Sequence, residues 1–219
     1  GGAQKRVSMF MSALAPMIKN REFEKARNQF VHVLGISKIS DFFMLSFFQK
    51  MLNKYHGGRI QVSTDSSSPG LYPVYGTYLH SPQLSKMTFT DLYFPKGDDL
   101  PYNADYLVPN PLGHPVSEGF TFGDVSNYKG DVTMKMTLNN LFVFNDTVKQ
   151  VEEIVKCHNE LLQTVVPRDF YSVLMSMEEM FKDPDKAIHI YNKNRQLYDR
   201  FGGSTRDLVN NEVFNQFFE

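Results

Sequence analysis

Apolar side chains recur at intervals of three and four positions over much of the chain, with short apolar runs between the periodic stretches. The helical spacing predicts a helix over residues 7–30, interrupted near Pro16, and a second helix over residues 42–56. Residues 31–36 and 59–64 are runs bounded by turn residues, which predicts a strand on either side of the second helix, the first of them buried.

A strand, a helix and a second strand in succession form the unit from which parallel sheets are built. Both strands of such a unit deliver their C-terminal ends to one edge of the sheet, where the functional sites of α/β proteins lie. We therefore expect residues 35–38 and 65–70, which follow the two strands, to lie next to each other.

The remaining chain is predicted to be an irregular segment followed by helices. Residues 71–130 contain many prolines and only short extended runs, which indicates loops and a few strands packed by aromatic side chains. Residues 132–144 are predicted to contain a further strand. Helices are expected after it, over residues 146–165, 169–181 and 185–200.

Composition narrows the class of protein. The chain has 219 residues, of which 42% are hydrophobic and 21% charged, as in globular proteins with a packed core. Its length is slightly below the roughly 250 residues of a complete (β/α)8 barrel. The net charge of −1 gives no overall attraction to nucleic acid or anionic membranes. Cys157 is the single cysteine and no apolar run approaches the roughly 18 residues of a membrane span, so a cytoplasmic protein is predicted.

Asp65 is the main candidate for chemistry, because it directly follows the second predicted strand. Asp, Ser and Pro are common turn residues, so residues 65–70 are also explained as an ordinary loop. As a functional group, an aspartate at this edge can attack an anomeric carbon to form a covalent glycosyl-enzyme. The hydroxyls of Ser66 and Ser67 are then expected to keep the carboxylate ionised by hydrogen bonding.

Other candidate features carry weaker signals. His32 lies in the first predicted strand, where an imidazole with satisfied hydrogen bonds in the core is the simplest interpretation. The last predicted helix carries a basic stripe interleaved with Tyr191 and Tyr198, which fits either a solvated face or a contact with a phosphate backbone. The stripe consists of Lys186, Lys193, Arg195 and Arg200. No histidines have the spacing of metal ligands, so no metal is predicted.

Short motifs follow one another in a recognisable order. They are Gly1-Gly2-Ala3, residues 31–36, Thr64 to Pro69, residues 110–117, and Leu138-Asn139-Asn140-Leu141. This order resembles the second half of the tRNA-guanine transglycosylase superfamily, and most closely its divergent, often phage-encoded members that insert 7-deazaguanines into DNA. In that family the nucleophilic Asp is followed by Pro four residues on, a spacing that Asp65 and Pro69 keep. The family's Thr-Arg after this Pro is replaced here by Gly70-Leu71.

The zinc element of the family is altered in this chain. Its Cys-x-Cys-x-x-Cys run resembles Leu112 to Ser117, so none of the thiolates remains. Its zinc-binding His corresponds to Asn139. Loss of all these ligands implies that no zinc binds, and that hydrogen bonds and packing take over the structural role.

The resemblance implies an α/β fold that is the C-terminal portion of a (β/α)8 TIM-type barrel. Residues 1–70 would supply barrel units, residues 71–145 an irregular insertion in place of the zinc element, and residues 146–219 C-terminal helices. The implied reaction exchanges guanine for a 7-deazaguanine base in nucleic acid, DNA rather than tRNA, with Asp65 as nucleophile and no cofactor. Substrate contacts are expected from Gly1, Gly2, Ala3, His32, Gly35, Ser66 and Ser67.

The resemblance also implies a partner. The family's second carboxylate, which positions the incoming base, lies in the first half of its barrel and has no counterpart here. An N-terminal complement of the barrel or a second subunit is therefore expected to act with this chain, and no membrane partner is expected. Two alternatives remain open: a non-catalytic subunit that binds nucleic acid or supports a catalytic partner, and an unrelated α/β domain or phage structural protein.

Overall fold

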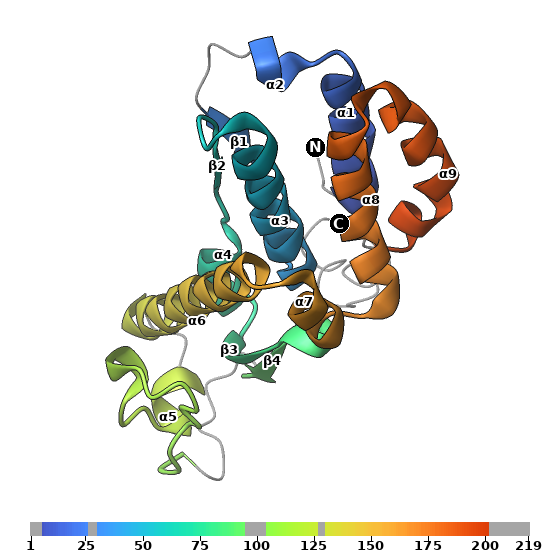
Figure 1. Cartoon of the computed structure of the whole chain (residues 1–219). Helices are drawn as coiled ribbons and strands as arrows, with labels where there is room; N and C mark the ends of the chain where they lie inside the picture. Colours follow the sequence, from blue (N-terminus) through green and yellow to red (C-terminus); the bar gives the residue numbers. More distant parts are fainter. Residues whose placement is uncertain (1–5, 26–29, 95–103, 127–129, 202–219) are drawn as a thin grey trace, which may run out of the picture. The chain divides into compact units, whose positions relative to one another are not determined.

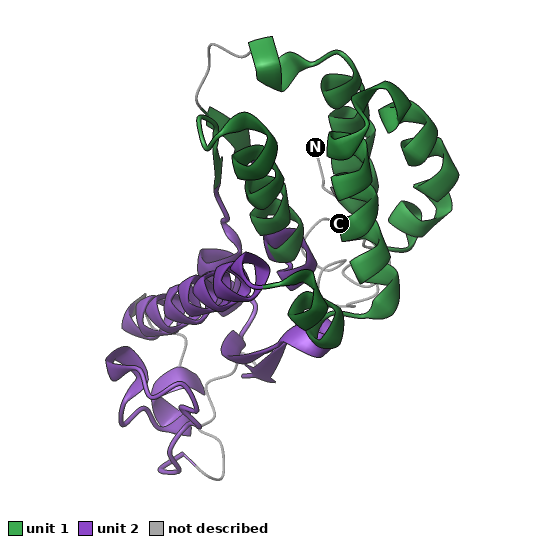
Figure 2. Cartoon of the chain, viewed as in Figure 1, with its two compact units in different colours: residues 1–33, 43–63, 158–219 green, residues 34–42, 64–157 purple. Residues whose placement is uncertain are grey.

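The computed structural model describes residues 6–25, 30–94, 104–126 and 130–201, and combines many α-helices with small β-sheets (Figure 1). The predicted α/β class is confirmed. The chain divides into two compact units (Figure 2). Unit 1 comprises residues 1–33, 43–63 and 158–219, and unit 2 comprises residues 34–42 and 64–157. Both units are discontinuous in sequence, so neither coincides with the predicted segments 1–70, 71–145 and 146–219.

The N-terminal helix α1 (Arg6–Lys19) continues through Pro16, so the predicted interruption at that residue is wrong. The helix instead ends after Lys19, and Arg21 adopts a left-handed conformation with φ of 56° before the short helix α2 (Glu22–Lys25). A proline inside a helix removes one hydrogen bond, but a buried apolar face can offset this cost. The buried face of α1 consists of Val7, Met11, Leu14, Ala15 and Ile18.

Helix α3 (Ile39–His56) confirms the predicted second helix. At its start Asp41 Oδ2 accepts a hydrogen bond of 3.4 Å from the Lys38 amide, as the side chain at a helix N-terminus commonly does. At its end Gly57 and Gly58 have φ values of +67° and +69°, a conformation that terminates helices and that glycine adopts without strain.

Strands β1 (Phe30–Val33) and β2 (Gln61–Thr64) pair with each other. In the sequence, β1 precedes α3 and β2 follows it. Hydrogen bonds join His32 to Ser63 and Ile36 to Asp65, so the two segments run in the same direction, as predicted. The prediction of a buried first strand is wrong, because Phe30 and His32 are exposed and the strand's other residues are only half-buried.

The described remainder of unit 1 is mainly helical. Helices α7 (Asn159–Val165), α8 (Arg168–Lys182) and α9 (Ala187–Arg200) follow one another, and α1 lies against α8 and α9. The buried hydroxyl of Tyr198 donates a hydrogen bond of 2.9 Å to Ser176 Oγ and so joins α9 to α8. Helices α8 and α9 match the helices expected over residues 169–181 and 185–200, because their apolar residues keep a regular helical spacing. The helix expected over residues 146–165 is not continuous: it is broken at Cys157 and His158, and α7 begins after this break.

Unit 2 contains helix α4 (Ser68–Val74) and an antiparallel hairpin of β3 (Thr77–Gln83) and β4 (Thr88–Tyr93), joined by the 3-10 turn η1 (Leu84–Lys86). A bulge shifts the register of β3 between Leu79 and Ser81. Beyond the hairpin lie η2 (Pro115–Ser117) and α5 (Phe122–Ser126). The apolar cluster of this unit contains Tyr78, Phe94, Val108, Val125, Val132 and Met136.

Residues 132–144, predicted as a strand region, instead belong to the long helix α6 (Gly130–Lys156). Their buried positions recur every three or four residues, which is the helical period and not the alternation of a strand. The buried residues of α6 are Val132, Met136, Asn139, Asn140, Val143, Phe144, Thr147, Val151 and Val155. Two adjacent asparagines within this face hid its period in the sequence.

Candidate functional site

Asp65 lies in unit 2 and directly follows β2, as the sequence predicts. It precedes α4, a helix where the sequence predicted a loop and the start of an irregular segment. Its carboxylate oxygen Oδ1 accepts a hydrogen bond of 2.7 Å from the Gly35 amide, and its backbone carbonyl accepts one of 2.9 Å from the Ile36 amide. The predicted neighbourhood of residues 35–38 and 65–70 is therefore confirmed. Asp65 is exposed to solvent, so the second carboxylate oxygen remains accessible to a ligand.

Gly35 holds the carboxylate through its backbone conformation. Its φ is +73°, in the left-handed region that side chains other than glycine rarely occupy. No atom lies within 4 Å of the position that a Cβ would take, so it is the backbone angle, and not lack of space, that favours glycine. The resemblance assigns Gly35 to substrate contact, whereas in the structure its amide orients Asp65.

The hydroxyls of Ser66 and Ser67 do not hold the carboxylate. Ser66 Oγ accepts a hydrogen bond of 3.2 Å from the Ser68 amide, at the start of α4. Ser67 accepts hydrogen bonds from the Gly70 and Leu71 amides through its backbone carbonyl. Both serines thus shape the turn into α4, which is the ordinary loop role considered for them from the sequence.

His32 lies in unit 1 and is exposed, so its interpretation as a core imidazole is wrong. Its Nδ1 is 2.9 Å from Ser63 Oγ, a hydrogen bond between the neighbouring strands β1 and β2. The other residues expected to contact substrate, Gly1, Gly2 and Ala3, lie outside the described residues.

Three positions that the resemblance aligns with zinc ligands come together in the interior of unit 2. His114, Ser117 and Asn139 are each at most 2% exposed. Ser117 Oγ donates a hydrogen bond of 2.6 Å to Asn139 Oδ1 and lies 3.0 Å from His114 Nδ1. The His114 ring also stacks on Phe142, with 4.1 Å between the ring centroids. The prediction that hydrogen bonds and packing join these positions agrees with this geometry.

The asparagines of α6 extend this network to strand β3. Asn139 Nδ2 donates to the Leu79 carbonyl at 2.8 Å, and Asn140 Oδ1 accepts from the Leu79 amide at 2.8 Å. Asn140 Nδ2 also donates to the Thr77 carbonyl at 3.0 Å. The sequence analysis missed the role of Asn140. Its signal is an amide side chain at a buried position of an otherwise apolar helix face, where a hydrogen-bonding partner is required.

Burial shifts the pKa values of two titratable residues in this hydrogen-bonded group, His114 and Tyr78. It lowers the pKa of His114 below its ordinary value, and a hydrogen bond with Asn139 opposes this effect only in part. Burial likewise raises the pKa of Tyr78, with a smaller opposing effect from a hydrogen bond with Ser117. Both shifts favour the neutral forms of the His114 and Tyr78 side chains. In the described part of the chain, no three His, Cys, Asp or Glu residues are grouped so that they could hold a metal ion.

The basic stripe of α9 is less available to a phosphate backbone than the sequence indicates. Tyr198 is fully buried and Tyr191 stacks on it, with ring centroids 5.6 Å apart. Arg200 pairs with Asp169 at 2.9 Å and Lys186 pairs with Asp183 at 2.6 Å. The pattern therefore fits a solvated face, the first of the two interpretations.

Within residues 6–25, 30–94, 104–126 and 130–201, no helix combines the length and the apolar character needed to cross a membrane. Comparison of the chain with protein families, with curated proteins and with solved structures finds no match.

Proposed function

We propose that this chain is part of a guanine transglycosylase that replaces guanine by a 7-deazaguanine base in nucleic acid, with DNA as the preferred substrate. We also propose that the parallel strands β1 and β2 belong to a (β/α)8 barrel. The observation that supports it most is the Asp65 carboxylate, exposed at the C-terminal end of β2 and fixed through one oxygen by the Gly35 amide. A carboxylate oriented in this way can act as a nucleophile.

The proposed reaction has two displacements at the sugar carbon C1′. In the first, the free oxygen of Asp65 forms a bond to C1′ while the C1′–N9 bond breaks, and guanine leaves with the electron pair and takes up a proton from solvent. In the second, the ring nitrogen of the 7-deazaguanine attacks C1′, loses its proton, and releases the aspartate. The target base must leave the helical stack for this to occur.

The hydrogen bond from Gly35 has two roles in this reaction. It fixes the carboxylate so that Oδ2 is the oxygen free to attack, and it stabilises the anion that is restored when the second displacement releases Asp65. Groups that bind the incoming base would come from Gly1, Gly2 and Ala3 and from an N-terminal complement of the barrel or a second subunit. No cofactor takes part.

The test is an exchange assay with radiolabelled guanine in duplex DNA and in tRNA, in which the chain is assayed alone and with its N-terminal complement. We expect label to exchange with the wild-type chain and a covalent adduct to be trapped, both of which disappear with Asp65→Ala. Asp105→Ala removes another exposed loop carboxylate of unit 2 and serves as the matched control. An adduct that persists in Asp65→Ala contradicts the assignment of the nucleophile.

The second candidate is a subunit that binds nucleic acid or supports a catalytic partner without reacting itself. It is favoured by the Ser66 hydroxyl, which bonds to the start of α4 and leaves the carboxylate with the Gly35 amide as its hydrogen-bond donor. The same assay separates the two functions. Nucleic-acid binding without exchange, both alone and with the complement, supports the second candidate.

A further inference from the structure

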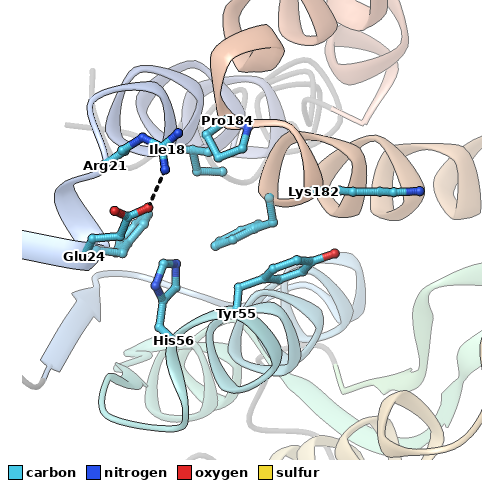
Figure 3. Close-up of a pocket in the computed structure, with 9 residues that line it drawn as sticks. Ile18, Arg21, Glu24, Tyr55, His56, Lys182 and Pro184 are labelled. Carbon is cyan, nitrogen blue, oxygen red and sulfur yellow. Dashed lines mark hydrogen bonds and ion pairs between the residues drawn. The ribbon is translucent and has the colours of Figure 1, made fainter.

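A cavity of about 230 Å³ opens in unit 1, whereas Asp65 belongs to unit 2. Its walls come from the ends of α1, α2, α3 and α8, which bring together segments far apart in the chain (Figure 3). Ile18 and Pro184 form its apolar side. None of its lining residues has a role in the proposed base exchange.

Aromatic side chains make one wall of this cavity. The rings of Phe23 and Tyr55 each lie within about 25° of parallel to the ring of Phe181, with centroids 6.0 and 5.8 Å away. The His56 ring meets Phe181 edge-on, at 61° and 6.0 Å. A wall of nearly parallel rings favours a flat aromatic ligand, because such a ligand can stack on it or meet its edges.

The polar end of the cavity offers unused hydrogen-bonding groups. Glu24 Oε1 accepts a hydrogen bond of 3.0 Å from Arg21, and its Oε2 has no partner among the described residues. Neither ring nitrogen of His56 has a hydrogen-bond partner within that part of the chain. Figure 3 shows the Glu24 carboxylate directed to Arg21, with the His56 ring nearby in the lining, whereas Lys182 extends away. Burial lowers the pKa of His56, so the neutral ring offers one donor and one acceptor.

The volume of the cavity and the charges of its lining limit the class of ligand that it can bind. A cavity of about 150 Å³ holds a benzene ring, and drug-sized ligands need about 300 Å³ or more, so this cavity fits one fused ring pair. The guanidinium of Arg21 is paired with Glu24 and offsets the charge of its carboxylate, which disfavours a cationic ligand. The ligand must also donate to a carboxylate and accept from an imidazole.

We propose that this cavity binds a purine-type nitrogen heterocycle, whose amino group donates to Glu24 and whose ring nitrogen pairs with His56. Such a ring can come from a free nucleoside or from an unstacked base of a single strand. In the second case Arg21 and Lys182 at the rim would lie near the backbone phosphates. The site is independent of Asp65, so it can exist whether or not the chain exchanges bases.

The test is saturation-transfer NMR with adenosine, which is not a substrate of the proposed guanine exchange. We expect saturation of the purine protons by the wild-type chain, and about a tenfold rise in Kd with Glu24→Gln or His56→Ala. Glu22→Gln, on the same short helix, and His189→Ala, an exposed histidine of α9, are matched controls with unchanged Kd. Asp65→Ala also leaves this binding unchanged, although it abolishes exchange if the proposed function is correct.

Phenol and the oligonucleotide dA8 complete the experiment. Phenol is flat but has one hydroxyl in place of the separate amino donor and ring-nitrogen acceptor, so it cannot bond to Glu24 and His56 together. We therefore expect it to bind much more weakly than adenosine. A lower Kd for dA8 that rises with salt identifies a single strand as the source of the base, and equal Kd values identify a free nucleoside. Equal binding of phenol and adenosine, no binding of adenosine or dA8, or full binding by both pocket variants overturns the proposal.

Discussion

The Gly35 amide donates a hydrogen bond of 2.7 Å to Asp65 Oδ1, so that the loop after β1 holds the carboxylate that follows β2. The partners are thirty residues apart in sequence and lie next to each other because their strands run in the same direction. The bond depends on a backbone angle, since Gly35 has φ of +73°. A substitution there therefore acts on the reactive group without removing any side-chain contact.

Gly35→Ala is expected to destabilise the fold by about 1 kcal/mol, because an alanine is strained in the left-handed region. If the residue relaxes its backbone to escape this strain, the amide moves away from Asp65 and any covalent adduct forms more slowly. Urea unfolding measures the first effect and adduct trapping the second.

Gly70→Ala is the matched control for this prediction. Gly70 lies in α4 without a positive φ, and no atom lies within 4 Å of the position of its Cβ. Alanine there is expected to be neutral or stabilising, because it restricts the unfolded chain. A Gly35→Ala variant as stable as Gly70→Ala would contradict the backbone argument.

Asn140→Ala is expected to destabilise the protein by about 2–4 kcal/mol. It removes the acceptor for the Leu79 amide and a donor to the Thr77 carbonyl, and these peptide groups then lack a partner at the junction of α6 and β3. Asn145→Ala, at an exposed position of the same helix, should change stability by less than about 0.5 kcal/mol. Chemical denaturation of the two variants tests the prediction, and equal midpoints would show that the amide network contributes little.

The stability of the protein is expected to fall as the pH drops from 7.5 towards 5. Burial lowers the pKa of His114 in the folded protein, whereas the unfolded chain takes up the proton near the ordinary value of about 6.5. The unfolded chain therefore binds more protons in this window, and the free energy of unfolding decreases with decreasing pH. His56 contributes with the same sign, because burial lowers its pKa as well.

His114→Asn separates the two histidines. The variant keeps a polar group beside Ser117 but cannot titrate, so its free energy of unfolding should depend less steeply on pH between 7.5 and 5 than that of the wild type. The measurement is urea unfolding at several pH values. A variant whose slope equals that of the wild type assigns the pH dependence to other groups.

The sequence predicted the parts of this fold that depend on local patterns. Helix α3 has an acidic residue at its start and paired glycines after its end, and α8 and α9 have regular apolar faces, so their bounds were close to those observed. Asp65 was located at the end of its strand because the strand-forming run before it and the turn residues after it are also local patterns. The first part of helix α6, before residue 146, was missed because Asn139 and Asn140 occupy its buried face, and their partners in β3 lie about sixty residues earlier in the chain.

In the candidate site, too, the sequence predicted what depends on local patterns and missed what depends on distant partners. A turn residue after a strand was visible in the sequence, but the donor that holds it was not, because the Gly35 amide has no side chain to signal it. The serines were assigned to the carboxylate on composition, and the geometry of the turn directs Ser66 Oγ to the start of α4 instead. The cavity of unit 1 joins four helices, and no local pattern reveals such a convergence.

Tyr198→Phe tests the contact between α9 and α8. The hydroxyl of Tyr198 donates to Ser176 Oγ at 2.9 Å in the interior, so its loss should cost about 1 kcal/mol at neutral pH. Burial raises the pKa of Tyr198 to about 12, whereas the unfolded chain ionises near 10. The unfolded chain thus loses this proton first, and the wild type loses stability as the pH rises from 10 to 12.

The variant should lose less stability over this alkaline range, because it lacks the buried phenol of Tyr198. Tyr106→Phe, at a residue that is 67% exposed, should behave as the wild type does. Spectrophotometric titration provides an independent measurement, in which the wild type should have one more late-titrating tyrosine than Tyr198→Phe. If the variant has as many late-titrating tyrosines as the wild type, other buried phenols are responsible, and Tyr78, whose pKa is also raised by burial, is the residue to substitute next.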